Sequence, residues 1–125
     1  MYKILVIDDE KPTLNMSRLL LGASGYNVVT AEGGVEGLEV FRREKPDIVI
    51  TDMKMPGMDG LAILDEIKKE SPETEVIVIT GHGDSDLAEQ AANHGSGGFI
   101  HKPIQKKILD EELKKAEGRL RMNTE

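Results

Sequence analysis

Residues 4–10 read Ile4-Leu5-Val6-Ile7-Asp8-Asp9-Glu10, a solid apolar run that ends in three consecutive acids. Solid runs rich in β-branched residues are typical of strands that are covered on both faces, as in a parallel sheet. Further short apolar runs follow at 28–29, 48–50, 76–79 and, more weakly, 99–100. We therefore expect residues 4–7 to form the first of five parallel strands.

Between these runs, the apolar residues recur with a helical period. The pattern predicts helices over 12–24, 35–44 and 61–70, a weaker Ala-rich helix from Leu87 to near Gly95, and a last helix from Gln105 onward. The residues expected to face the core are Leu14, Leu19, Leu20, Leu21, Val35, Leu38, Phe41, Leu61, Ile63, Leu64, Ile67, Leu87, Ala88, Ala91, Ala92, Ile108, Leu109, Leu113, Ala116 and Leu120. Strands that alternate with helices predict an α/β fold, a (βα)5 doubly wound open parallel five-stranded sheet.

The length and composition fit one compact domain, which we expect to span residues 1–121, with 122–125 as a short, frayed C-terminal tail. Of the 125 residues, 38% are hydrophobic, and the formal net charge is −7, which argues against direct nucleic acid binding. No cysteine is present, so disulfides and thiolate chemistry are excluded. We see no signal peptide and no run apolar enough for a membrane helix, and expect a cytoplasmic protein.

Polar side chains stand at the expected carboxyl ends of four strands, where the functional crevice of such sheets lies. They are the acids at 8–10, Asp52, Thr80 and Lys102. Crowded carboxylates need a counter-charge, and Mg²⁺ favours a few carboxylates together with water and phosphate oxygens. Lys102 and Thr80 would contact an anionic group beside the metal, and Asp52 could itself be the nucleophile that forms an aspartyl-phosphate.

The motifs Ile7-Asp8-Asp9-Glu10, Asp52-Met53-Lys54-Met55-Pro56-Gly57-Met58-Asp59-Gly60, Thr80-Gly81 and Lys102-Pro103 occur in order and at matching spacing across nearly the whole chain. In this the sequence resembles the receiver domains of bacterial response regulators. The resemblance implies the flavodoxin-like strand order 2-1-3-4-5. It also implies a phosphorylation-activated switch in a two-component system, which catalyses only its own phosphotransfer and autodephosphorylation.

The resemblance assigns roles to individual residues. Asp52 matches the phosphoacceptor, Asp9 and Asp52 the direct Mg²⁺ ligands, Asp8 a ligand acting through water, and Lys54 a ligand through its backbone carbonyl. Thr80 matches the switch hydroxyl, Lys102 the lysine that contacts the phosphoryl group, and Phe99 the aromatic that swings inward with Thr80. In the family the Lys102-Pro103 peptide is usually cis.

The resemblance also implies partners. A sensor histidine kinase would donate the phosphoryl group. The face formed by the fourth helix, fifth strand and fifth helix would then control an output domain or a downstream protein, or form a homodimer. The sequence departs from the family at Gly95, Gly97 and Gly98, which we expect to loosen this loop and the fifth strand. His82 and Lys54 stand where family members tune dephosphorylation, so either could set its rate.

Other interpretations remain open. Asp8 and Asp9 could be a helix-capping pair, Thr80 an ordinary strand-end residue, and His94 and His101 surface histidines. A phosphohydrolase with an aspartyl nucleophile, of the haloacid-dehalogenase kind, would need a second Asp where Lys54 stands. A flavodoxin-like cofactor binder would need a phosphate-cradling loop where the acids at 8–10 stand, and a receiver-like scaffold would no longer accept phosphate.

Overall fold

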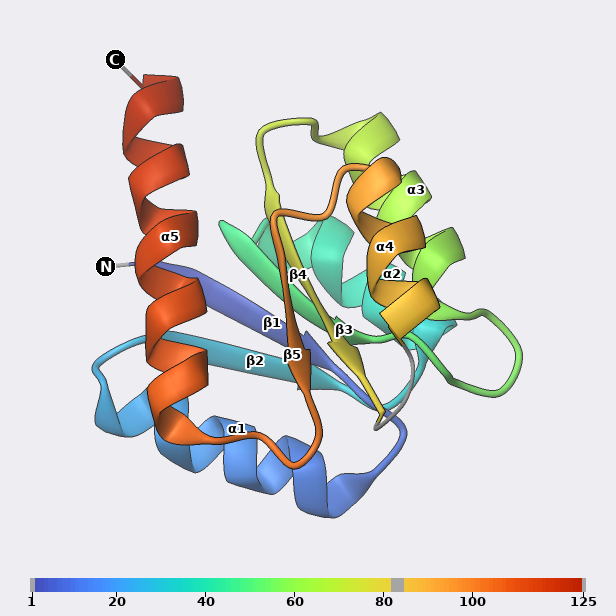
Figure 1. The fold of residues 1–125 in the computed structure, drawn as a ribbon, viewed down its shortest axis with the longest axis horizontal. Helices are drawn as coiled ribbons and strands as arrows, with labels where there is room; N and C mark the ends of the chain where they lie inside the picture. The colour runs from blue at the N-terminus through green and yellow to red at the C-terminus, as the bar shows by residue number, and fades with distance from the viewer. Residues whose placement is uncertain (1, 82–84, 125) are drawn as a thin grey trace.

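The computed structural model describes residues 2–81 and 85–124, which form five strands and five helices in strict alternation (Figure 1). The strands pair in parallel in the order β2-β1-β3-β4-β5, so the predicted fold and strand order are confirmed. No described helix is long and apolar enough to cross a membrane. The elements are β1 (Lys3–Ile7), α1 (Lys11–Ala23), β2 (Asn27–Ala31), α2 (Gly34–Glu44), β3 (Ile48–Asp52), α3 (Gly60–Glu70), β4 (Glu75–Thr80), α4 (Ser85–Asn93), β5 (Gly98–His101) and α5 (Lys106–Thr124).

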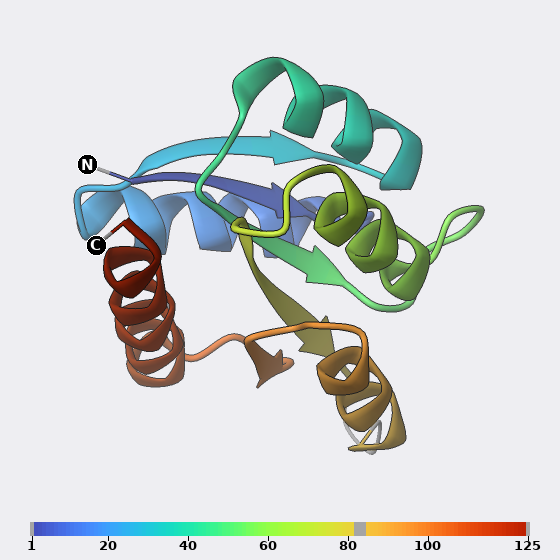
Figure 2. The same cartoon turned by 90° about the horizontal axis from the view of Figure 1, so that it is seen from above.

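Helices cover both faces of the sheet, as Figure 2 shows from above. Successive strand residues point to opposite faces, so Leu5 and Ile7 of β1 pack under α2, α3 and α4, while Ile4 and Val6 pack under α1 and α5. All residues of the central strands β3 and β4 are buried. This explains why their sequences are solid apolar runs rather than alternating ones.

Local signals set several helix boundaries at both ends of the sheet. The side chain of Asp59 accepts a hydrogen bond from the backbone N–H of Ala62, at 2.9 Å, and so caps the start of α3. Lys45 ends α2 in the left-handed conformation, with φ 49°, and Pro12 lies in the first turn of α1. The loops after β1 and β3, which carry the site, therefore end at defined positions.

Four residues expected in the core are exposed: Ala92, and Leu19, Val35 and Ile108, whose exposed fractions are 70%, 66% and 39%. In α1 the buried residues are Leu14, Ser17 and Leu21, a helical spacing that places Leu19 on the opposite side. The buried Ser17 completes this face, and the pattern of apolar residues alone does not predict its burial.

Helix α5 continues through Thr124, so residues 122–124 of the expected tail are helical. Leu120 is packed on the core beneath the helix, and Arg121 and Met122 are good helix formers, so the helix gains by continuing.

Gly97, just before β5, and Gly98, the first residue of β5, leave room for charged side chains of α5 and β4. A Cβ atom at Gly97 would lie 2.6 Å from both Arg119 Nη2 and Glu75 Oε1, and one at Gly98 would collide with the carboxylate of Glu112. In the segment that was expected to be loosened by glycine, charged side chains therefore approach the backbone closely. Gly95, with φ 102°, closes the turn after α4.

Candidate functional site

The site lies where β1 and β3, which are neighbours in the sheet, reach their carboxyl ends. Asp8 follows β1 directly and Asp52 is the last residue of β3, so the parallel pairing brings two carboxylates side by side. Both residues are buried, with exposed fractions of 0% and 5%. Asp8, Glu10 and Asp52 each offer one carboxylate oxygen, and these three oxygens lie within 4.8 Å of one another.

Backbone N–H groups hold the two buried carboxylates in place. Asp8 Oδ1 accepts a hydrogen bond from the N–H of Glu10 at 2.8 Å, and Asp52 Oδ1 accepts one from the N–H of Lys54 at 3.1 Å. Such local bonds, from a carboxylate to the N–H two residues on, fix the direction of the side chain. The second oxygen of each carboxylate, Oδ2, faces a shared space, which the ammonium of Lys102 enters.

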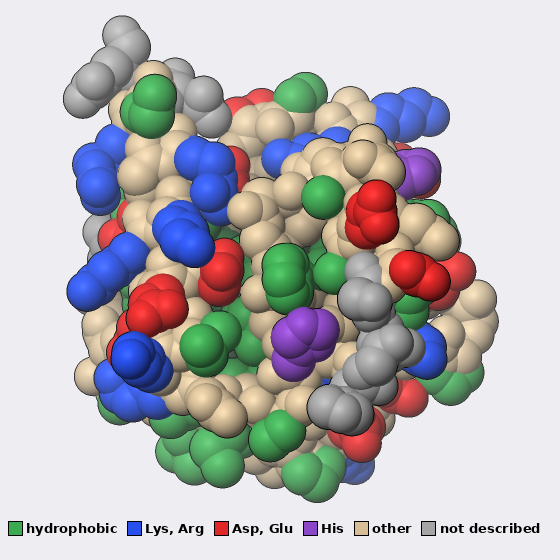
Figure 3. All heavy atoms as spheres, viewed as in Figure 1, with side chains coloured by type: hydrophobic (Ala, Val, Ile, Leu, Met, Phe, Trp, Pro, Cys, Tyr) green, Lys and Arg blue, Asp and Glu red, His purple; other side chains and the backbone are tan. Residues whose placement is uncertain are grey.

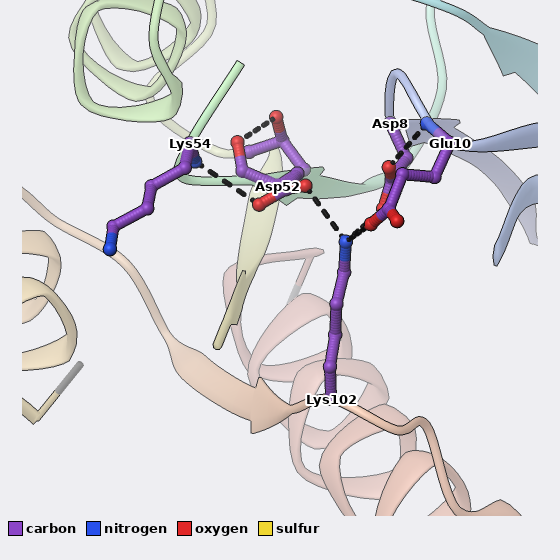
Figure 4. A network of polar contacts seen from close by, with 6 residues as sticks. Asp8, Glu10, Asp52, Lys54 and Lys102 are labelled. Atoms are coloured by element: carbon purple, nitrogen blue, oxygen red, sulfur yellow. Dashed lines mark hydrogen bonds and ion pairs between the residues drawn. The ribbon is translucent and has the colours of Figure 1, made fainter. Parts of the chain in front are cut away.

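Lys102 supplies the positive charge in that space. It follows β5, on the far side of β4, and Figure 4 shows its side chain extending between Asp52 and the pair Asp8 and Glu10. Its Nζ donates a hydrogen bond to Asp52 Oδ2 at 3.0 Å, lies 3.3 Å from Asp8 Oδ2, and also pairs with Glu10. The Lys102-Pro103 peptide is cis, as the resemblance implied.

The environment shifts the pKa values of two members of this cluster. Burial raises the pKa of Asp8 to about 6; the N–H of Glu10 and the charge of Lys102 act against this rise, and the charge of Asp52 adds to it. For Lys102, burial alone would lower the pKa. Its hydrogen bonds to Glu10 and Asp52, with the nearby carboxylates, outweigh burial and raise its pKa well above the usual range. The ammonium therefore stays charged at neutral pH.

The loop after Asp52 folds back onto its own strand. Met53 N–H bonds to the carbonyl of Ile79, and Gly60 N–H bonds to the carbonyl of Met53 at 3.1 Å. A Cβ at Gly60 would lie 2.6 Å from Met53 Cα and closer still to the carbonyl oxygen of Asp52. Only glycine allows α3 to begin this close to the end of β3. Figure 4 also shows that the side chain of Lys54 extends away from the carboxylates.

Thr80 ends β4 beside this cluster and is buried. Its Oγ1 lies 2.9 Å from Nδ1 of His101, its register partner on β5. The imidazole of His101 in turn meets the ring of Phe99 edge-on, with ring centroids 5.2 Å apart and an angle of 73°. Phe99 is 45% exposed and lies on the outer surface.

The oxygen atoms at the site suit a hard divalent cation such as Mg²⁺. Asp8 Oδ2 is buried and accepts no hydrogen bond from any described residue, so it has an open coordination position beside the 3.3 Å contact with Lys102. Asp8, Glu10 and Asp52 are the carboxylates that could hold the ion. Asp9 is exposed and lies outside this group, so its assignment as a ligand stays a prediction, as does that of the Lys54 carbonyl. His82 lies outside the described residues.

Two residues at the site were not assigned a role from the sequence, Glu10 and His101. Glu10 follows Asp8-Asp9 at the same strand end, so its proximity to Asp52 was available as a signal. His101 was expected to be a surface residue, and it is exposed, yet its ring contacts both Thr80 and Phe99. It precedes Lys102 directly and lies two residues after Phe99, which places both side chains on one face of β5.

Comparison with known proteins agrees with this architecture. The family model for the response regulator receiver domain matches residues 4–114. The transcriptional regulatory protein GlrR of Escherichia coli K12 is 43% identical over 106 residues, which cover 85% of this chain and 24% of GlrR. The DNA-binding transcriptional regulator NtrC of the same organism is 37% identical over 101 residues, covering 81% of this chain and 22% of NtrC. The chain thus spans about a quarter of the length of these relatives.

Solved structures agree at the level of the backbone. A response regulator receiver domain protein from Clostridium thermocellum superposes with a TM-score of 0.93 at 42% identity, over 98% of both chains. NtrX from Brucella abortus gives a TM-score of 0.86 at 34% identity, over 98% of this chain and 27% of NtrX. The chain therefore belongs to the family of response regulator receiver domains, the phosphorylation-dependent signalling switches of two-component systems.

Proposed function

We propose that Asp52 accepts a phosphoryl group from the phosphohistidine of a sensor kinase in a Mg²⁺-dependent reaction. The observation that carries the proposal is that Asp52 and Asp8 converge on the ammonium of Lys102 at the carboxyl end of a parallel sheet. Asp52 Oδ2 lies 3.0 Å and Asp8 Oδ2 lies 3.3 Å from its Nζ. Phosphoryl transfer needs little beyond positioning and charge neutralisation, and this cluster offers both.

In the transfer, an oxygen of Asp52 attacks phosphorus, the new O–P bond forms and the P–N bond to the donor imidazole breaks. The imidazole leaves with the bonding electron pair and takes up a proton. Mg²⁺, held by Asp8 and Asp52 with Asp9 or Glu10 nearby, would neutralise charge on the phosphoryl oxygens. Lys102 would move from the carboxylate of Asp52 to the phosphoryl group, because both are anions within its reach.

Intact mass after incubation with Mg²⁺ and acetyl phosphate tests this directly. We expect one phosphoryl adduct in the wild type and none in Asp52→Asn or in an EDTA sample. Asp59→Asn, on an exposed acid that caps α3 nearby, is the matched control and should still form the adduct. A wild type that forms no adduct and does not respond to beryllofluoride would be a receiver-like scaffold. Steady release of phosphate from esters would instead indicate a hydrolase.

A hollow beside Lys102 supports docking of the donor on this side of the site. It has a volume of about 430 Å³ and is lined mainly by apolar groups, including Pro12, Met16, Pro103 and Ile104. Met16 is half exposed there. We expect Met16→Glu to slow transfer from a phosphorylated kinase at least tenfold more than transfer from acetyl phosphate. Leu19→Glu, on the exposed side of α1 and outside the hollow, should slow neither. Equal slowing with both donors would contradict docking here.

The face of α4, β5 and α5 is proposed as the output surface, for a partner domain, a downstream protein or a second copy of the chain. Figure 3 looks onto this face and shows hydrophobic side chains in its middle, with charged side chains of α5 beside them. Phe99 and Ile108 are exposed, and a groove of about 280 Å³ runs between α4 and Phe99. Thr80 and Phe99 would carry the phosphorylation signal to this face. We propose that the transfer of the phosphoryl group from the kinase to Asp52 takes place in the cytoplasm.

A further inference from the structure

His101 holds the hydroxyl of Thr80 on one side of its strand. The Oγ1–Nδ1 distance is 2.9 Å, and the two residues are register partners on β4 and β5. The sheet order places β4 between β5 and β3, and β3 ends in Asp52. A hydroxyl that is bonded to His101 therefore faces away from the strand that carries the proposed phosphoacceptor.

This orientation is incompatible with a hydrogen bond to a phosphoryl group on Asp52. The hydroxyl of Thr80 would have to turn from the β5 side of its strand to the β3 side, and this movement separates Oγ1 from Nδ1 whichever atom donates. Thr80 is buried, so no bulk water takes the place of His101 as its partner. The strength of this hydrogen bond therefore biases the equilibrium between the two orientations.

The same imidazole contacts the second residue that the proposed switch moves. Phe99 meets the His101 ring edge-on at 5.2 Å, an arrangement that is favourable for aromatic pairs. Phe99 and His101 also line the groove along α4 together. One side chain on β5 thus contacts both Thr80 and Phe99.

We propose that His101 is a positioning residue that keeps Thr80 and Phe99 in their unphosphorylated arrangement through its hydrogen bond to the Thr80 hydroxyl. This inference rests on the proposed function, in which Asp52 is the phosphoacceptor and Thr80 follows the phosphoryl group. It makes the residue directly before Lys102 a determinant of how readily this receiver switches.

The test is a titration of the whole protein with beryllofluoride in the presence of Mg²⁺, followed by the NMR signals of the Phe99 ring. His101→Phe keeps a ring beside Phe99 but removes the nitrogen, while His101→Asn keeps a polar group able to bond Oγ1. For His101→Phe we expect half-conversion at about fivefold lower beryllofluoride, the effect of one net hydrogen bond. His101→Asn should stay near the wild type. Equal half-conversion for His101→Phe and wild type would overturn the inference.

A double-mutant cycle with Thr80→Val separates the hydrogen bond from the ring contact. In the Thr80→Val background, His101→Phe should no longer change the half-conversion concentration; an undiminished effect there would overturn the inference. Within the wild type, the ¹⁵N shift of His101 Nδ1 should change on conversion, because its partner leaves. An unchanged shift alongside a converted Phe99 signal would show that the bond persists, and would also overturn it.

The two proposals fail in different ways. If the wild type neither converts with beryllofluoride nor forms the acetyl phosphate adduct, the proposed function is contradicted, and so is the role of His101 that rests on it. If the wild type converts and His101→Phe converts at the same beryllofluoride concentration, only the role of His101 is contradicted.

Discussion

The ammonium of Lys102 lies 3.0 Å from the carboxylate of Asp52, across fifty residues of sequence. It is 3.3 Å from Asp8 as well, and both carboxylates are buried. Lys102 therefore balances, in the free protein, the same negative charge that Mg²⁺ would balance. The lysine and the metal ion must compete for these oxygens, because two cations this close to each other repel strongly.

Removing that competitor should tighten metal binding. We expect Lys102→Met, which keeps a chain of similar length, to bind Mg²⁺ roughly tenfold more tightly than the wild type, as measured by calorimetry. Lys106→Met removes an equal charge from an exposed pair with Asp110 and is the matched control, which should bind Mg²⁺ nearly as the wild type does. Unchanged or weaker Mg²⁺ binding by Lys102→Met would show that the ammonium of Lys102 does not compete with the ion for these carboxylates.

The buried carboxylate of Asp8 makes stability depend on pH. Its pKa in the folded protein is about 6, against an ordinary value of 3.8, so the folded chain binds this proton more tightly than the unfolded chain. Asp8 then favours folding more as the pH falls from 7 towards 4. At pH 7 its ionised form lowers the free energy of unfolding by roughly 2–3 kcal/mol, at about 1.4 kcal/mol per pKa unit.

Urea unfolding without Mg²⁺ checks this. Asp8→Asn should be more stable than the wild type by about 2 kcal/mol at pH 7, and the difference should shrink as the pH approaches 4. Asp9→Asn, which changes an exposed neighbour, should differ from the wild type by less than about 0.5 kcal/mol at both pH values. A stability gain of Asp8→Asn that is the same at both pH values would show that the cause is not the charge of Asp8.

The order of the elements and the gathering of Asp8, Asp52, Thr80 and Lys102 at one sheet edge could be predicted from the sequence. Solid apolar runs mark the strands, and parallel strands bring their carboxyl ends to the same edge. Both features depend only on positions along the chain, so the residues that follow each strand are predictable even where the direction of their side chains is not.

Side-chain direction and register explain what was missed. Whether Asp9 or Glu10 turns toward Asp52 depends on the turn after β1, where the Glu10 N–H bonds to Asp8. The contact of Thr80 with His101 depends on the β4·β5 register, which a short, weak strand does not reveal. The space at Gly97 and Gly98 depends on how α5 lies across β5, so glycine alone suggested looseness where the structure has close packing.

Gly60 should tolerate no side chain, because an added Cβ meets backbone atoms of Asp52 and Met53 that have little freedom to move. We expect Gly60→Ala to lower the free energy of unfolding by about 2–3 kcal/mol and to slow labelling of Asp52 by acetyl phosphate. Gly22→Ala is the control, since the same methyl group in α1 has nothing within 4 Å; it should raise stability by about 0.5–1 kcal/mol. Similar effects of the two substitutions would contradict the close approach of α3 to β3.

Arg119 of α5 provides the partner of a buried acid at the start of β4. Its Nε lies 2.5 Å from Oε1 of Glu75, which is only 6% exposed. Arg119→Ala leaves this carboxylate buried without its partner, so the free energy of unfolding should fall by about 2 kcal/mol. The loss stays at the lower end of the range for such pairs because the charge of Lys68 also acts on Glu75.

Chemical denaturation of matched variants separates this effect from the loss of a surface ion pair. Arg43→Ala breaks an exposed pair with Glu44 and should change stability by less than about 0.5 kcal/mol. The double variant Glu75→Gln, Arg119→Ala should recover part of the loss, because no buried charge is then left without a partner. The opposite result would be that the effects of the two single substitutions on the free energy of unfolding simply add in the double variant. In that case the two side chains act independently, and the ion pair does not hold α5 against β4.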